Sequence, residues 1–263
     1  MKPRAVVLAF SLAGSAWTVA AWSAEPAAKA PGKKAAAAAK APKVSTAAVV
    51  EVPITFAPVS TAALTTQAVL ARFEEFDRRL DTLRAHFVQS LNVEQTGMSS
   101  AVEGDVSYRK PEQLRIEHLR PERQTVAVDG KDIWIFRHAT HQAIQSSLED
   151  WKKADPTLNN LMQFGSYAKM LRSYEVSVDT GGARPELVLV PKEKGAAPLE
   201  LRLGLDPETL FPDETRLQVG GLRVKTVLSG IVFNPRLEAA TFRFTPPEGS
   251  DVFRNFKPPQ IQP

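Results

Sequence analysis

The chain has 263 residues, 43% of them hydrophobic, so it is long enough to bury one sizeable core. It contains no cysteine, which excludes disulfides, thiolate metal sites, cysteine nucleophiles and the lipid-modified N-terminal cysteine of a bacterial lipoprotein. The net charge of +4 arises in residues 1–60, with seven basic and two acidic side chains, and the nearly neutral remainder excludes the basic face of a nucleic-acid-binding domain.

The first 23 residues are typical of a secretory signal peptide. A short basic region, Met1 to Arg4, precedes a mostly apolar run from Ala5 to Ala21, and the small residue Ser23 follows. We expect cleavage after Ser23 and export of the mature chain. The alternative is an uncleaved membrane anchor, for which an apolar run of about 17 residues is at the short limit.

Residues 24–60 form a tract rich in Ala, Lys and Pro that includes "AAKAPGKKAAAAAKAPK". Repeated proline and glycine disfavour one stable helix, and the small side chains cannot build a core. The tract is predicted to be a flexible linker before a folded domain over residues 61–263. An alternative role for its lysines is contact with anionic lipid headgroups or cell-wall polymers.

Residues 64–90 carry the clearest helical pattern of the chain. Apolar side chains recur there at steps of three and four, with charged residues between them, and no proline or glycine interrupts the stretch. The spacing predicts one amphipathic helix that lies on an apolar surface. Its apolar positions are Val69, Phe73, Phe76, Leu80, Leu83 and Phe87.

After Phe87 the period of the apolar residues changes to two, which is the pattern of strands. Asp129-Gly130 is a strong hairpin turn within this region. Roughly a dozen short strands with turns between them predict one large antiparallel sheet, a sandwich or a barrel. The stretches are "VEGDVSYRK", "QLRIEHL", "RQTVAVDGKDIWIFR", "HQAIQS", "YEVSVD", "ELVLVP", "LELRLGLD", "TRLQVG", "LRVKTVLSGI" and "TFRFT".

One segment, residues 155–174, interrupts the strands with apolar residues at helical spacing. Asp155 is placed to cap a helix whose first position is Pro156, and Gly165 should weaken it in the middle. A helix inserted between strands is expected to cover a sheet face or the mouth of a curved sheet. Its apolar residues are Leu158, Leu161, Met162, Met170 and Leu171.

The motifs that carry chemistry are weak in this chain. Ser166-Tyr-Ala-Lys169 matches one motif of the penicillin-recognising enzymes, but the other two are missing. His138 and His141 have no obvious third ligand and are interpreted as two turn histidines. We therefore expect no enzyme activity, no metal and no cofactor. The two remaining interpretations of the apolar strands are a binding site for an apolar ligand and an ordinary core.

Four stretches, in this order and spacing, resemble the LolA family of periplasmic carriers of outer-membrane lipoproteins. They are "LRAHFVQS", "VEGDVSYRKPEQLRIE", "QTVAVDGKDIWIF" and "FRFTPPEGSDV", and the resemblance covers residues 64–254. It implies a mainly β fold with helices (α+β), in which an unclosed antiparallel β-barrel is covered by a helical lid. The terminal segment would then be a closing strand whose prolines stop further pairing at an edge.

The resemblance also implies a function. The chain is expected to be a periplasmic, monomeric carrier that takes acyl chains of lipoproteins from an inner-membrane ABC exporter and delivers them to an outer-membrane lipoprotein receptor. Lys110 matches a family arginine that latches the lid by hydrogen bonds to its backbone carbonyls, and Arg109 is expected to face the other side of the strand. The residues expected to line the lipid cavity are Leu114, Ile116, Trp134, Phe136, Leu161, Met162, Met170 and Leu171.

Three alternatives stay open at this point. The cargo can be another lipid or an acyl-pigment, or the fold can serve as a periplasmic lipid-sensing regulatory module. An exported hydrolase with an unrecognised site is the third. Only "NFKPPQIQP" follows Arg254, and the absence of a further C-terminal domain disfavours the sensor.

Overall fold

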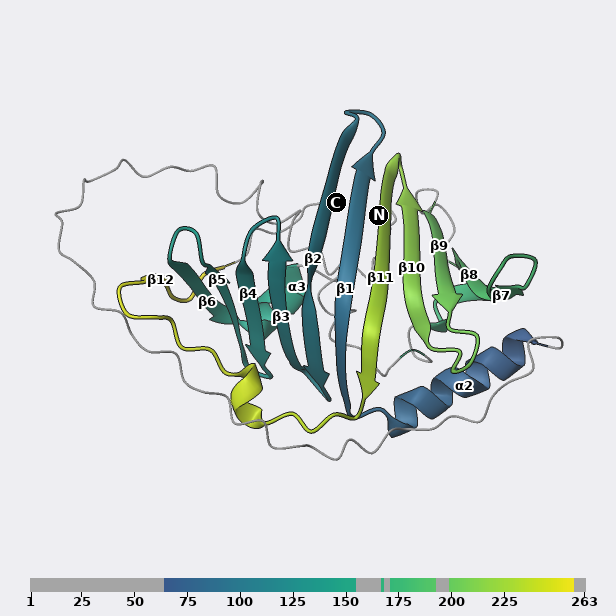
Figure 1. The fold of residues 1–263 in the computed structure, drawn as a ribbon, viewed down its shortest axis with the longest axis horizontal. Helices are drawn as coiled ribbons and strands as arrows, with labels where there is room; N and C mark the ends of the chain where they lie inside the picture. Colours follow the sequence, from purple (N-terminus) through teal and green to yellow (C-terminus); the bar gives the residue numbers. More distant parts are fainter. Residues whose placement is uncertain (1–63, 155–166, 168–170, 193–198, 258–263) are drawn as a thin grey trace.

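The computed structural model describes residues 64–154, 167, 171–192 and 199–257. The predicted signal peptide and linker lie outside these residues, as does most of the helix predicted over 155–174. In the described part of the chain, twelve strands form one sheet in the order β12-β6-β5-β4-β3-β2-β1-β11-β10-β9-β8-β7 (Figure 1).

The strands and helices follow the alternation seen in the sequence. The strands are β1 (Thr82–Val93), β2 (Met98–Arg109), β3 (Gln113–Arg120), β4 (Gln124–Asp129), β5 (Asp132–Arg137), β6 (Gln142–Ser147), β7 (Tyr174–Asp179), β8 (Glu186–Pro191), β9 (Leu199–Leu205), β10 (Pro212–Val219), β11 (Leu222–Phe233) and β12 (Asp251–Phe253). The helices with described bounds are α2 (Thr66–Arg79), α3 (Leu148–Ala154) and the short 3-10 helix η2 (Ala239–Phe242).

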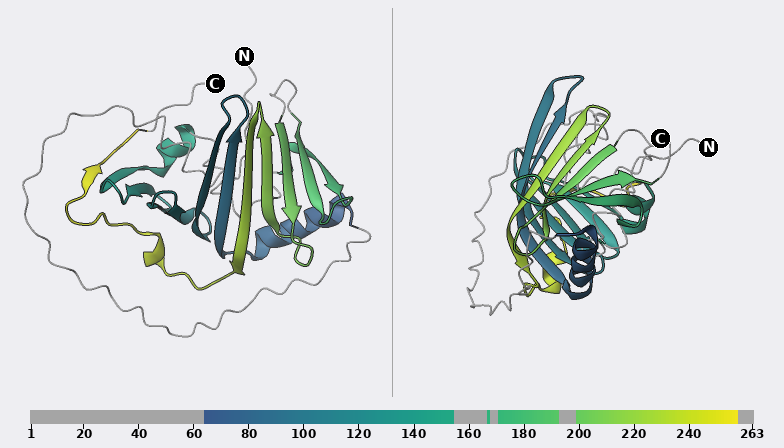
Figure 2. Two further views of the ribbon diagram at one scale, coloured as in Figure 1. Left: turned by 45° about the horizontal axis from the view of Figure 1, so that its top comes forward. Right: turned by 90° about the vertical axis from the view of Figure 1, so that its right-hand side faces the viewer.

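The sheet does not close. Neighbouring strands pair antiparallel, except that β12 pairs with β6 in parallel, and β12 and β7 are the two edges. Figure 2 shows the sheet as a curved surface with α2 beside it. The predicted fold class, a mainly β protein built on an unclosed antiparallel sheet, is therefore confirmed.

The helix predicted over residues 64–90 is wrong in its second half. α2 begins after the cap residue Thr65, whose hydroxyl accepts a hydrogen bond from the Ala68 N–H at 3.2 Å, and it ends at Arg79. Residues 82–93 form β1 instead. Leu83 and Phe87 are four residues apart, a spacing that fits a helix with a period near 3.6 and also a strand with a period of two. The strand pattern is complete because Ala85 and Gln89, at the other alternate positions, are also buried.

A residue far along the chain explains where the helix stops. Asn234 donates from Nδ2 to the carbonyl of Arg79 at 2.9 Å, and its Oδ1 accepts the N–H groups of Asp81 at 2.8 Å and Thr82 at 3.2 Å. These three bonds satisfy backbone groups that a continuing helix would have paired internally. The chain therefore turns from helix to strand at a tertiary contact.

The register defines two faces of the sheet. We call the inner face the one that carries the cross-strand row Leu83, Tyr108, Leu114, Val128 and Ile133, on β1 to β5. Each of these side chains is at most 2% exposed and belongs to the same hydrophobic core as the apolar stripe of α2. The other side is the outer face.

The C-terminal segment, residues 235–257, corrects a second prediction. The sequence predicts "TFRFT" as the closing strand, but its first residues lie in η2 and the paired strand is β12, further along the chain. Phe242 is buried, and Phe244 packs on the outer face with its ring 5.4 Å from that of Phe136. The aromatic side chains bury against the sheet, and Pro246 and Pro247 have no N–H to offer a ladder.

A helix that the sequence did not reveal follows β6. α3 is short, and the Ser147 hydroxyl accepts a hydrogen bond from the Asp150 N–H at 3.2 Å near its start. Leu148 and Trp151 anchor it in the described core. Of the helix predicted over 155–174, only Tyr167 and the residues from Leu171 onward are described, and β7 begins at Tyr174.

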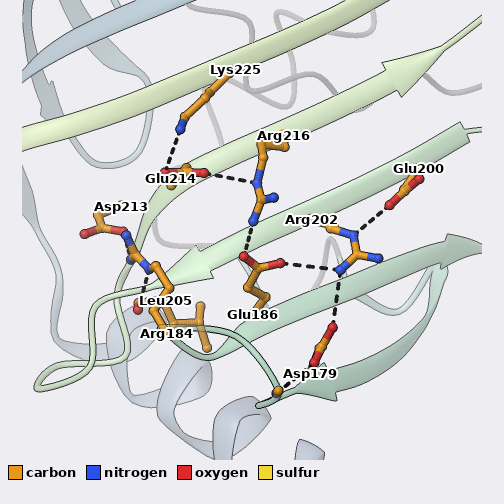
Figure 3. A network of polar contacts seen from close by, with 11 residues as sticks. Asp179, Arg184, Glu186, Glu200, Arg202, Leu205, Asp213, Glu214, Arg216 and Lys225 are labelled. Atoms are coloured by element: carbon orange, nitrogen blue, oxygen red, sulfur yellow. Dashed lines mark hydrogen bonds and ion pairs between the residues drawn. The ribbon is translucent and has the colours of Figure 1, made fainter.

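The outer face of β8 to β11 is charged and partly exposed to solvent. Arg202, Arg216 and Lys225 lie directly opposite one another on adjacent strands, an arrangement of like charges that is unfavourable by itself. Figure 3 shows how acidic residues separate them: Glu214 bridges Arg216 at 3.0 Å and Lys225 at 3.3 Å, and Glu186 pairs with both arginines.

Candidate functional site

The inner face carries a second apolar row beside the one that defines it. Ala85, Val106, Ile116, Val126 and Ile135 lie directly opposite one another on β1 to β5. The first four are at most 8% exposed, whereas Ile135 is only partly buried against the core. Two adjacent rows of this kind form an apolar surface that spans five strands.

A polar row bounds this surface on one side. Gly104, His118, Gln124 and Arg137 follow one another across β2 to β5 in the next inward-facing position. His118 lies edge-on to the Phe87 ring, with 5.8 Å between ring centroids. The apolar lining of this half of the sheet is therefore two rows deep before side chains with hydrogen-bonding groups begin.

Leucine dominates the inner face in the other half of the sheet. Leucines from β8, β9 and β10 lie opposite one another in the register and are at most 3% exposed. Each strand places its leucines at every second position, so that they share the inner face; they alternate with valines in β8 and mostly with charged or polar residues in β9 and β10. They are Leu187, Leu189, Leu201, Leu203 and Leu217.

Aromatic rings join α2 to this face. The Phe76 ring is 5.3 Å from that of Phe211 and 6.2 Å from that of Phe233, and the Phe73 ring is 5.4 Å from that of Tyr167. Offset and edge-to-face contacts of this kind contribute about 0.5–1.5 kcal/mol each beyond the burial of their area. Burial also raises the pKa of Tyr167 far above its usual range, so the ring stays neutral.

Two hydrogen bonds connect α2 to its surroundings at Asp77. The Nζ of Lys110 donates to the carbonyl oxygen of Asp77, and the Asp77 carboxylate accepts the N–H of Tyr167 at 2.7 Å. The Lys110 N–H also donates to the Asp81 carbonyl at 2.9 Å. One helical residue is thus held by the β2–β3 turn on one side and by Tyr167 on the other.

The structure brings together some of the predicted site residues and separates others. Leu114 and Ile116 lie in the two apolar rows of the inner face. Trp134 and Phe136 are placed on the outer face, because they pair with Ala127 and Thr125. That face is covered by the C-terminal segment there, with the Trp134 ring 5.9 Å from that of Phe244. Leu114 and Ile116 therefore lie on the opposite face of the sheet from Trp134 and Phe136, and the four side chains do not line one cavity.

The remaining predicted residues belong to the segment after α3 and to the β2–β3 turn. Leu171 is buried in the core, whereas Leu161, Met162 and Met170 lie outside the described residues. Lys110 is half-buried and contacts α2 as described above, and Arg109 points to the outer face, where its guanidinium lies 5.2 Å from the centre of the Phe242 ring.

Two inner-face residues were missed by the sequence analysis. Ile133 and Ile135 flank the conspicuous aromatics of the β4–β5 hairpin, and they, not the aromatics, pair with Val128 and Val126. The signal was present: the turn at Asp129-Gly130 fixes which positions of the two strands oppose each other, so the face of β4 also determines the face of β5.

The main feature of the described residues is the apolar inner face, which is a surface for binding. They contain no group of three His, Asp or Glu side chains placed to hold a metal ion. Within the same ranges, no helix has the length and apolar character needed to cross a membrane.

Comparison with known proteins gives consistent matches. A family model described as "Outer membrane lipoprotein carrier protein LolA" matches residues 78–245. The outer-membrane lipoprotein carrier protein of Xanthomonas oryzae is 28% identical over 208 residues, covering 76% of this chain and 96% of that protein. The carrier protein of Azotobacter vinelandii is 26% identical over 186 residues, covering 70% and 87%.

Solved structures also match. The crystal structure of a LolA superfamily protein from Nitrosomonas europaea covers 69% of this chain and 99% of its own, with a TM-score of 0.42 and 13% sequence identity.

Proposed function

The chain belongs to the LolA family of outer membrane lipoprotein carrier proteins, and from this premise we propose that it is a periplasmic carrier for acylated lipoproteins. In this proposal, the acyl chains bind against the inner face of the sheet. An inner-membrane ABC exporter loads the carrier, and a receptor at the outer membrane unloads it. The similar proteins of Xanthomonas oryzae and Azotobacter vinelandii are named as carriers of this kind.

The observation that carries the proposal is the apolar inner face. Two full cross-strand rows on β1 to β5, and leucines on β8 to β10, offer hydrocarbon surface to an acyl chain. A chain of 16 carbons has about 15 methylene and methyl groups, so at about 0.8 kcal/mol each its exposure to water costs about 12 kcal/mol. A carrier must offset most of that cost by burial, and this requires no catalytic group.

The cover must move aside for cargo to reach this surface. α2 contacts its surroundings through aromatic packing and through the bonds at Asp77, and its displacement would break these contacts. Acyl chains that enter would replace the rings of α2 as apolar partners of the sheet. The polar row of the inner face, which includes His118 and Gln124, would then face the polar end of the cargo.

Binding of an acylated peptide tests the proposal directly. A synthetic triacylated lipopeptide, delivered by dilution from detergent, is expected to bind the mature protein in a complex of about one to one that survives gel filtration. The same peptide without acyl chains is the matched control and should not bind. Failure of the acylated peptide to bind, or equal binding of both peptides, would contradict acyl-chain carriage.

Lys110 is proposed to latch α2, and Lys110→Met tests this. The substitution keeps the apolar stem and removes the hydrogen bond to the Asp77 carbonyl, a charge-assisted bond worth about 1.5–3 kcal/mol. Amide hydrogen exchange in the last turn of α2 is expected to become about tenfold faster, and Lys110→Arg should retain protection. Arg109→Met, on the outer face, is the matched control, and equal exchange in both methionine variants would contradict the latch.

A further inference from the structure

A pocket lies on the outer face, on the opposite side of the sheet from the proposed acyl-binding surface. It has a volume of about 410 Å³ and is lined by residues of strands β3 to β5 and by Phe244 and Pro247 of the C-terminal segment. This volume is within the range of pockets that bind small molecules, about 300–1,000 Å³. The two histidines singled out in the sequence, His138 and His141, line it.

One side of the pocket is aromatic and apolar. The Phe136 and Phe244 rings are 5.4 Å apart, and Pro247 lies beside them in the lining. The His138 and His141 rings stand edge-on to Phe136, with centroids 4.8 Å and 6.2 Å from it. A flat apolar group of a ligand would meet ring surface here rather than charged side chains.

The two carboxylates of the pocket already have partners. Glu117 accepts from the Arg115 Nε at 2.6 Å and from the Thr125 hydroxyl at 2.6 Å, and Asp105 lies 2.9 Å from the Nδ1 of His86. Arg115 is used as well, because it also donates to the Thr241 carbonyl at 3.3 Å. Glu117 is therefore paired with a cation, and Asp105 lies within hydrogen-bond distance of His86.

The protonation of His138 follows from the same network. The only hydroxyl proton of Thr125 goes to Glu117, so the Thr125 oxygen accepts from the Nε2–H of His138, at 3.0 Å. Burial, and then the charge of Arg123, hold the pKa of His138 below its usual range. At neutral pH this imidazole is therefore uncharged and does not compete with Arg123 for an anion.

Arg123 is the second arginine of the pocket lining, and it is exposed. Its guanidinium forms no hydrogen bond or ion pair with any residue that the structure describes, whereas Arg115 in the same lining is paired. The N–H donors of a planar guanidinium are placed so that two of them can bind the two oxygens of one carboxylate. The pocket thus combines one available cation with an aromatic wall.

We propose that this pocket binds the carboxylate of an organic anion, with Arg123 pairing with the carboxylate and the apolar body of the ligand packing against Phe136 and Phe244. The site is separate from acyl-chain carriage and does not depend on it. Two sources share this chemistry: a small aromatic acid, and the C-terminal carboxylate of a peptide that ends in an apolar residue.

The test uses histidine imidazole signals in NMR spectra of the mature protein. Phenylacetate and the dipeptide N-acetyl-Leu-Phe are titrated, with phenylacetamide and the dipeptide amide as uncharged controls. We expect saturable shifts of the His138 and His141 signals with a carboxylate probe, and binding at least about tenfold weaker for its amide, since the charge-assisted pair is lost. Binding of phenylacetate alone identifies a small-acid site, and tighter binding of the dipeptide identifies a peptide terminus.

Two arginine variants separate recognition from structure. Arg123→Gln should weaken binding of the carboxylate probe at least about tenfold without changing the unfolding temperature. Arg120→Gln is the matched control, since Arg120 is exposed in the same turn region and pairs with Glu103 outside the pocket, and it should bind as the native protein does. The absence of saturable shifts with either carboxylate, or equal affinity of native protein and Arg123→Gln, would overturn the proposal.

Discussion

Ile135→Glu is expected to reduce acyl-lipopeptide affinity by about 100-fold or more while the protein stays folded. Ile135 lies in the second apolar row of the inner face but is only partly buried, so a glutamate can be tolerated in the empty protein. Bound acyl chains would surround its carboxylate with hydrocarbon, and an ion moved into such surroundings costs several kcal/mol. The gel-filtration assay with the triacylated lipopeptide measures the loss, and circular dichroism verifies the fold.

The matched control places the same charge on the other face. Val88 is 46% exposed, and it pairs with Glu103 on the outer face of the sheet. Val88→Glu should lower stability slightly, because two like charges then lie opposite each other, and should leave lipopeptide affinity unchanged. Unchanged affinity in a folded Ile135→Glu protein would mean that acyl chains do not contact this row.

Gly104→Ala is expected to lower the free energy of unfolding by about 3 kcal/mol, at the upper end of typical overpacking costs. A Cβ built on Gly104 would lie 2.3 Å from the carbonyl oxygen of Glu117 and 2.8 Å from the Phe87 ring. The first contact is to the backbone of the neighbouring strand, so no side-chain rotation relieves it. The missing side chain is what allows the Phe87 ring to lie across β2 on the inner face.

Denaturant unfolding measures this cost, and another glycine provides the control. Gly182 has no positive φ, and a Cβ added there would have its nearest neighbouring atom 3.7 Å away, so Gly182→Ala should change stability by less than about 1 kcal/mol. If Gly104→Ala were as stable as Gly182→Ala, β2 and β3 would be able to separate without loss, and the tight crossing of Phe87 would not be structurally required.

The sequence was sufficient for most of the sheet, but not for β1, for β12 or for the end of α2. Alternation alone located most strands, because each has one face in the core and the other in contact with polar surroundings or the C-terminal segment. The helix end depends on Asn234, more than 150 residues away, and steps of three and four at Leu83 and Phe87 fit a strand equally well. A contact of that range leaves no local signal in the chain.

The candidate site shows the same division. Leu114 and Ile116 lie on the inner face, whereas Trp134 and Phe136, which were selected as large hairpin aromatics, lie on the outer face. A large aromatic side chain can be buried in a cavity on the inner face or under a segment that covers the outer face. Only the strand register distinguishes the two cases. Within the cover, residues 241–245 were predicted to pair as a strand; Phe244 packs instead against the rings of Trp134 and Phe136, and the paired strand is β12.

Native mass spectrometry of the protein, purified without detergent from the cells that produce it, tests acyl-chain carriage most directly. Extraction with organic solvent then identifies what was bound. Lipoprotein carriage predicts that an acylated polypeptide co-purifies with the protein and is recovered in the extract. A free lipid or acyl-pigment in its place, or an empty protein that also takes up no triacylated lipopeptide in vitro, would contradict lipoprotein carriage by this chain.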